Sequence, residues 1–132
     1  MIRYAFVDAN GYVTGAGSGP NLGDGALELP EGITPSASVD KRHVDGRFIP
    51  RPALATPEVT VFETSGRAVR FTGLPAATAA EIIDVDCGYS IATVPQTKGL
   101  IEIALPEPGR YRIEVTPPRP WLPTTIDIEV PQ

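Results

Sequence analysis

Hydrophobic and polar residues alternate along the last third of the chain, in the stretches 100–105, 110–115 and 124–130. A period of two residues places successive side chains on opposite faces of a β-strand. One face of each strand is therefore expected to be buried and the other to contact water. The residues expected to face inward are Ile101, Ile103, Leu105, Tyr111, Ile113, Val115, Ile126, Ile128 and Val130. Three such strands need a second sheet to cover their hydrophobic faces, which predicts two packed layers.

Further strand signals precede these three stretches. Strands are predicted at 59–64, 67–72 and 88–94, with turns at Ser65-Gly66 and at 95–98 before Gly99. The stretch 76–84 is ambiguous, because its alanines favour a helix and its isoleucines favour a strand. A loop or one helical turn leading into a short strand is expected there. About seven short strands at this spacing are typical of a small immunoglobulin-like β-sandwich, here at 56–132.

The first part of the chain, 1–55, reads as a hairpin region. Asn10-Gly11 is expected to connect a strand at 2–7 to a short return at 12–14, and Asp45-Gly46 is expected to turn a second hairpin within 39–49. The stretch 15–25 is expected to be a glycine-rich loop and 26–38 an irregular connection. Isolated hairpins are marginally stable, so this region is expected to dock on the sandwich, on copies of itself or on a partner. The whole chain is thus predicted to be all-β.

Composition and charge narrow the functional classes. The 132 residues include 13 glycines and 15 prolines, which suits short strands joined by many turns. The net charge of −5 argues against nucleic-acid binding, since phosphate contacts need clustered Lys and Arg. No stretch is apolar and long enough to insert into a membrane, and the first residues do not resemble a signal peptide, so synthesis in the cytoplasm is expected.

Candidate chemistry is sparse along the sequence. The glycine-rich stretch 15–25 lacks the following Lys-Ser or Lys-Thr of a phosphate-binding loop. The one histidine, His43, lies beside a predicted turn and is expected at the surface. Asp84 and Asp86 form too small a set of ligands for calcium. Cys87 is the sole cysteine, which excludes an intramolecular disulfide, and it is expected to be buried or half-buried. We therefore expect no catalytic, cofactor-binding or metal-binding residues.

Two groups of residues are candidates for contacts with a partner. Four prolines stiffen the loop 116–123, so an outward Trp121 would lose little conformational entropy on binding. Arg119, Trp121 and Leu122 are accordingly candidate contacts to a protein or a glycan, and the alternative is that Trp121 folds back and plugs one end of the sandwich. Tyr4, Phe6 and Phe48 are the candidate contact residues of the hairpin region.

The chain resembles small tail-fibre-associated and tail-tip proteins of bacteriophages. The resemblance rests on the Asn-Gly hairpin of 4–13, on the Asp-Gly hairpin that runs into Arg-Pro at 42–52, and on the Pro-Gly-x-Tyr strand within 105–115. The last of these is similar to a strand of immunoglobulin-like modules on phage tails. The resemblance implies a part of the virion whose N-terminal region attaches to the tail, and it implies no catalytic residues.

Three functional hypotheses follow. The first is a non-enzymatic structural component of a phage tail, an accessory or adaptor of the tail fibre or tail tip that serves virion assembly and host attachment. It would contact other tail proteins, occur as a homo-oligomer or in multiple copies, and reach the virion from the host cytoplasm. The second is a carbohydrate- or protein-binding sandwich module, for instance for a host-surface glycan, that uses Trp121. The third is a tail assembly helper that the finished virion does not retain.

Overall fold

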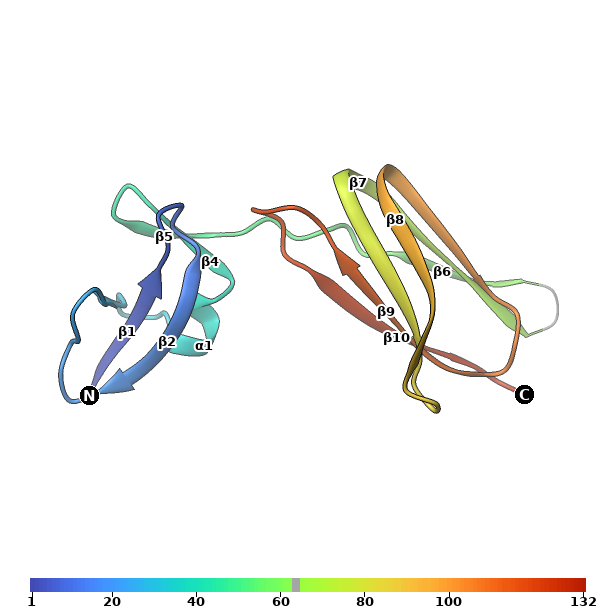
Figure 1. Ribbon diagram of the computed structural model, residues 1–132, viewed down its shortest axis with the longest axis horizontal. Coiled ribbons are helices and arrows are strands. Elements are labelled where there is room, and N and C mark those ends of the chain that lie inside the picture. The colour runs from blue at the N-terminus through green and yellow to red at the C-terminus, as the bar shows by residue number, and fades with distance from the viewer. Residues whose placement is uncertain (63–64) are drawn as a thin grey trace. The chain divides into compact units, whose positions relative to one another are not determined.

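The computed structural model describes residues 1–62 and 65–132, without the side chain of Phe62, and the chain forms two compact units. The units are Met1–Arg51 and Pro52–Gln132, whereas the sequence placed the boundary after residue 55 (Figure 1). Almost all of the regular structure is β, which confirms the predicted all-β class. The assignment to the immunoglobulin-like group in particular stays a prediction.

The described residues of the second unit form five strands, two of them unusually long. They are β6 (Glu58–Phe62), β7 (Gly66–Asp84), β8 (Tyr89–Leu105), β9 (Gly109–Thr116) and β10 (Thr124–Val130). These strands pair antiparallel in the order β10-β9-β7-β6, with β8 also paired to β7. The strands predicted at 100–105, 110–115 and 124–130 are confirmed. Of the strand predicted at 59–64, residues 63 and 64 lie outside the described residues.

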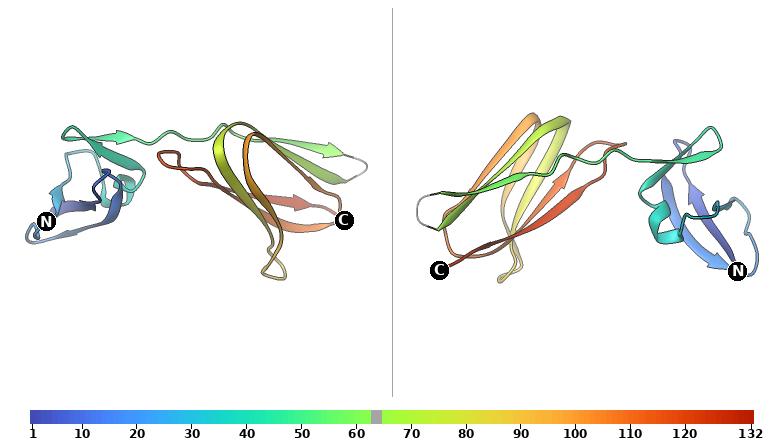
Figure 2. Two further views of the ribbon diagram at one scale, coloured as in Figure 1. Left: turned by 45° about the horizontal axis from the view of Figure 1, so that its top comes forward. Right: turned by 180° about the vertical axis from the view of Figure 1, so that it is seen from behind.

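Both long strands take part in two layers. Residues 67–71 of β7 lie between β6 and residues 101–105 of β8. Residues 80–84 of β7 instead lie between β9 and the first residues of β8, 89–94. The sheet therefore curls so that its two halves face one another, as the ribbons of β7 and β8 show in Figure 2.

The hydrophobic core lies between these two halves. Its buried residues come from both of them: Val69, Phe71, Leu74, Ala80, Ile82, Ile101, Ile103, Leu105, Tyr111, Ile113, Val115 and Val130. Seven of the nine residues expected to face inward are buried, while Ile126 and Ile128 are partly buried against the same cluster. The period-two pattern thus identified the inward faces correctly.

The bend between the layers corrects two expectations. Residues 76–84 form neither a loop nor a helical turn but continue β7, and the turn expected at 95–98 lies inside β8. The β7–β8 register shifts three times between Phe71 and Ala80, and Ala77 takes a positive φ of 68°. Leu74 is buried in the bend, and the hydroxyl of buried Thr78 donates to the carbonyl oxygen of Pro75 at 2.7 Å. Core burial on both sides of the bend keeps these residues extended despite their alanine content.

A tyrosine fixes the connection between β8 and β9. The hydroxyl of Tyr111 donates a 2.9 Å hydrogen bond to the carbonyl oxygen of Glu107, four residues upstream. The ring lies against Gly109, which has a φ of 153°, and a Cβ at that position would approach the ring to 3.3 Å. Burial is the main reason why the pKa of Tyr111 is raised, and the carboxylates of Asp84 and Glu107 contribute. The phenol therefore stays protonated and able to donate.

The first unit contains a three-stranded and a two-stranded sheet. Its elements are β1 (Ile2–Val7), β2 (Val13–Gly19), β3 (Leu27–Glu28), α1 (Pro35–Ser38), β4 (Lys41–Val44) and β5 (Arg47–Pro50). The larger sheet has the order β2-β1-β3, and β4 pairs with β5. Both predicted hairpins are confirmed. The glycine-rich loop expected from residue 15 is wrong for 15–19, which belong to β2.

The tip of the first hairpin supports the second. The Asp8 carboxylate accepts hydrogen bonds from the backbone nitrogens of Asn10 and Tyr12, at 2.9 and 3.0 Å. The backbone nitrogen of His43 then donates to the carbonyl oxygen of Gly11 at 2.8 Å. Gly11 has a φ of 88°, and a Cβ there would lie 2.1 Å from the carbonyl oxygen of His43. Glycine at this position therefore lets the two hairpins meet.

The Tyr111 hydrogen bond predicts the effect of removing one atom. Tyr111→Phe keeps the buried ring and leaves the Glu107 carbonyl without this donor, so the free energy of unfolding should fall by about 0.5–1.5 kcal/mol. Chemical denaturation followed by Trp121 fluorescence measures the change within the same unit. Tyr89→Phe is the matched control, because the Tyr89 side chain is 73% exposed and its loss of a hydroxyl should change nothing. Equal stability of Tyr111→Phe and the wild type would contradict this account.

The contact at Gly11 predicts a loss of structure in the first unit. Gly11→Ala combines a strained φ with a backbone clash, so it should destabilise that unit by about 2–4 kcal/mol. Hydrogen exchange of the amides of β1 and β4 should accelerate, while β9 keeps its protection. Gly25→Ala is the control, since its φ of 79° is similar but no atom lies within 4 Å of the added Cβ. Unchanged protection in Gly11→Ala would refute the proposed role of this contact.

Candidate binding surfaces

An aromatic surface lies on the first hairpin and contains two of the expected contact residues. Tyr4 is paired across the ladder with Gly17, and Phe6 with Gly15. Their rings lie 5.6 Å apart in an edge-to-face arrangement. A Cβ built on Gly17 would come within 3.0 Å of the Tyr4 hydroxyl oxygen, so the ring covers the strand backbone where a side chain would otherwise stand. We call Tyr4, Phe6, Gly15, Gly17 and Gly19 the aromatic–glycine face.

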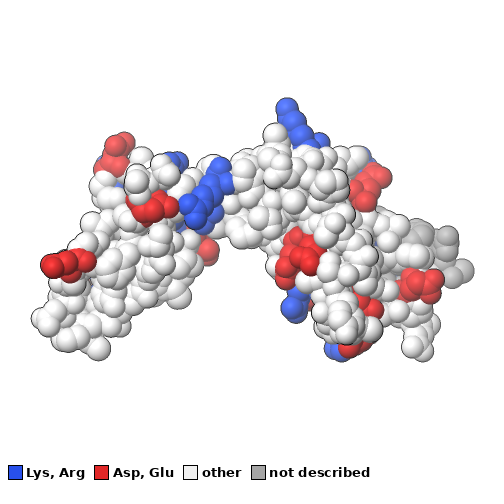
Figure 3. Space-filling model, in the orientation of Figure 1, with Lys and Arg blue, Asp and Glu red and all other residues white. Residues whose placement is uncertain are grey.

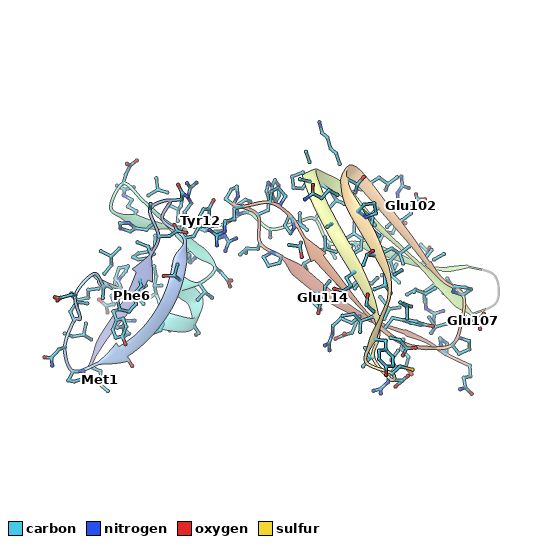
Figure 4. All side chains as sticks on the ribbon, in the orientation of Figure 1. Met1, Phe6, Tyr12, Glu102, Glu107 and Glu114 are labelled. Atoms are coloured by element: carbon cyan, nitrogen blue, oxygen red, sulfur yellow. The ribbon has the colours of Figure 1, made fainter. Side chains whose placement is uncertain are left out.

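This face is open to a partner. Phe6 is 38% exposed and Tyr4 is half-buried. Both rings line a shallow pocket with Ser18 and Gly19 at the end of β2 and with Pro20, Asn21 and Gly23 of the loop that follows. The visible surface over β1 and β2 carries few charged side chains (Figure 3). Phe6 is labelled on this hairpin in Figure 4. Flat, uncharged and aromatic surface of this kind is suited to packing against another protein.

The third expected contact residue of the region, Phe48, lies elsewhere. It lines a separate pocket between β3 and the β4–β5 hairpin, together with Leu27 and Leu29. Its ring centroid lies 4.9 Å from that of His43, with the two rings tilted by 55°, and His43 is half-buried rather than fully at the surface. The structure therefore does not bring Phe48 together with Tyr4 and Phe6 in one pocket.

The proline-rich loop is anchored within the second unit. The backbone nitrogen of Leu122 donates to the carbonyl oxygen of Pro52 at 2.9 Å, and Leu122 forms a bridge with Ala53. Trp121 and Leu122 are both half-buried, and Arg119 is exposed. The loop is thus neither a free arm nor a completely enclosed plug, and part of the Trp121 indole remains accessible.

The acidic residues of the turn between β7 and β8 stabilise the turn through hydrogen bonds and an ion pair. The Asp84 carboxylate accepts from the backbone nitrogens of Asp86 and Cys87, at 3.0 and 3.3 Å. Asp86 forms an ion pair with Arg110, whose side chain lowers the pKa of that carboxyl chiefly through a hydrogen bond. Within the described part of the chain, no group of three or more His, Cys, Asp or Glu could hold a metal ion.

Cys87 is exposed in this turn, which corrects the expectation of a buried or half-buried residue. The turn displays it because Asp84 holds the backbone on either side of Asp86. The negative charge of Asp84 is the main cause that raises the pKa of the Cys87 thiol. A thiol with a raised pKa holds little thiolate at neutral pH and is a weak nucleophile.

The exposed surface on the first part of β8 was not predicted from the sequence. Tyr89 and Ile91 are 73% and 53% exposed on the first part of β8, where residues 89–93 are all exposed. Among the described residues, this part of β8 pairs with β7 alone, so it forms an edge of the sheet. The available signal was the absence of charged residues from 87 to 97. This absence of charge indicates a contact surface only when residues 89–94 are known to form an edge of the sheet.

Comparisons with known proteins give no family for this chain. Searches against protein-family models, curated protein sequences and solved structures found no match. Within residues 1–62 and 65–132, no helix has the length and apolar character needed to cross a membrane.

The Cys87 environment predicts a charge-dependent reactivity. Asp84→Asn keeps a side-chain oxygen for the turn but removes the charge, so the pKa of Cys87 should fall and more thiolate should be present at pH 8. Alkylation by iodoacetamide, followed by mass spectrometry, should accelerate about two- to fivefold. Glu58→Gln removes one negative charge from β6 and should leave the rate unchanged. Equal rates in Asp84→Asn and the wild type would exclude this role of Asp84.

Proposed function

We propose that this protein is a non-enzymatic structural component of a bacteriophage tail, an accessory or adaptor of the tail fibre or tail tip. In this proposal the first unit attaches to other tail proteins through the aromatic–glycine face. The second unit forms a rigid module that braces neighbours or faces the host. The protein would reach the virion from the host cytoplasm and act in several copies.

The observation that supports attachment through the first unit is its small interior. Its buried residues are few: Ala5, Gly11, Tyr12, Leu29 and Ser38. Much larger apolar groups stay accessible, namely Met1, Phe6, Leu22, Val39 and Ile49. A small buried interior beside larger accessible apolar side chains is typical of small units that gain stability by covering hydrophobic surface against a partner.

The geometry of the second unit supports the immunoglobulin-like part of the proposal. Two layers of antiparallel strands enclose one core, and the hydroxyl of Tyr111 bonds to the backbone near the start of β9. A tyrosine that hydrogen-bonds to the backbone a few residues upstream at such a corner recurs in immunoglobulin-like sandwiches. This motif is the Pro-Gly-x-Tyr strand on which the resemblance to phage tail modules rests.

A glycan- or protein-binding module is the second candidate, and the accessible part of Trp121 favours it. Arg119 and Trp121 belong to the residue types enriched at binding hot spots. Titration with a glycan library, read by the emission of this single tryptophan, tests it directly. A saturable change, together with heats of binding that Trp121→Phe abolishes in a calorimetric titration, would support this candidate over a purely structural role.

Mass spectrometry of purified particles tests the tail assignment. Phages grown from a genome that carries this gene should contain the chain in multiple copies in the tail fraction. Phe6→Asp places a charge on the aromatic–glycine face and should reduce incorporation at least about tenfold. Val59→Asp, at a side chain that is 45% exposed on β6 of the second unit, should be incorporated normally.

Two results would contradict the proposal. Presence of the chain in lysates but not in complete particles would instead identify an assembly helper. Equal loss of incorporation in Phe6→Asp and Val59→Asp would exclude the aromatic–glycine face as the specific attachment surface.

A further inference from the structure

We propose that two copies of this chain pair through the first part of β8, residues 89–94, in antiparallel orientation. This part of β8 is hydrogen-bonded to β7 on one side, with Ile91 as the extra residue where the register shifts between Ile82 and Ile83, and no described strand pairs with its other side. Unpaired backbone groups on a strand edge are a template for another strand. The pairing is independent of the tail assignment, since it follows from this edge alone.

The edge differs from the other edges of the second unit in charge. The described residues of β6 include Glu58, residues 100–105 of β8 include Glu102, and β10 includes Asp127 and Glu129. Charged residues on an edge strand discourage pairing with another chain. Residues 89–94, Tyr-Ser-Ile-Ala-Thr-Val, carry no charge, and most of these residue types favour strands.

The distribution of charge around the edge favours a second copy as its occupant. The uncharged stretch 87–97 has Asp86 at one end and Lys98 at the other. An antiparallel pair centred on Ala92 brings Asp86 of each copy toward Lys98 of its partner. Asp86 also pairs with Arg110 in its own chain, but Asp84 keeps that end negative. The two ends of the edge therefore have opposite charge, which fits self-pairing despite the overall charge of −5.

The same register limits the assembly to a dimer. Pro95 lacks a backbone N–H, so a ladder that starts at Tyr89 ends there, and Tyr89 faces Pro95 of the partner. Ala92 faces Ala92 across the twofold axis, and Ile91 faces Thr93. One self-complementary edge per chain gives a closed twofold dimer instead of a filament. The layer β10-β9-β7-β8 then continues through the axis into its copy.

Sedimentation of the full chain tests the pairing, with Cys87→Ser as the background so that the exposed thiol cannot link copies. The wild-type edge should give a concentration-dependent dimer at micromolar concentrations. Ile91→Lys places a charge on the edge and should leave only monomer. Val61→Lys is the matched control: Val61 is 62% exposed on β6, whose edge already carries Glu58, and the dimer should persist. A monomeric background protein, a dimeric Ile91→Lys or a monomeric Val61→Lys would each overturn the proposal.

Disulfide trapping tests the register without depending on the charged variants. In the Cys87→Ser background, Ala92→Cys should cross-link under mild oxidation, because directly opposed residues have Cα atoms about 4.5–5.5 Å apart. Thr93→Cys is the control, since its two copies lie diagonally and beyond disulfide reach in this register. Efficient linkage of Thr93→Cys, or none of Ala92→Cys, would exclude the pairing centred on Ala92.

Discussion

The second unit depends on two strands that are each long enough to serve both layers. β7 and β8 remain paired on either side of a bend, so one hairpin supplies a central strand, from β7, and an edge strand, from β8, to each half of the sheet. The bend has to turn the chain without exposing the core or leaving polar groups unpaired. Leu74 fills the space between the halves, and the buried hydroxyl of Thr78 finds its acceptor in the carbonyl of Pro75. Burial of the surrounding core offsets the strained φ of Ala77.

Hydrophobic alternation predicted this unit well wherever one face of a strand is buried and the other wet. The inward positions of β9 and of residues 101–105 of β8 follow the period of two without exception. The bend could not be predicted in the same way, because Ala76 to Ala80 have weak local preferences that the core overrides. Nor could the exposure of Cys87, which depends on the hydrogen bonds of Asp84 within the turn.

The first unit shows the opposite relation between sequence and structure. Its turns were predictable from Asn10-Gly11 and Asp45-Gly46, but β2 was not, since glycine has a low preference for strands. Tyr4 and Phe6 supply the missing cover by lying across the glycines of the neighbouring strand. Tyr4 and Phe6 lie two residues apart on β1, which was predicted, but the glycines that their rings cover belong to a strand that the sequence pattern had assigned to a loop.

The two candidate contact surfaces should respond differently to their surroundings. The aromatic–glycine face offers rings over backbone, so its affinity for a partner would come from removing apolar area from water. The edge at residues 89–94 offers a row of backbone donors and acceptors, whose geometry admits only another extended strand. Contacts of the first kind tolerate many partners of suitable shape, whereas a strand edge specifies direction and register. A chain that carries both can join a varied assembly through one unit and a defined copy of itself through the other.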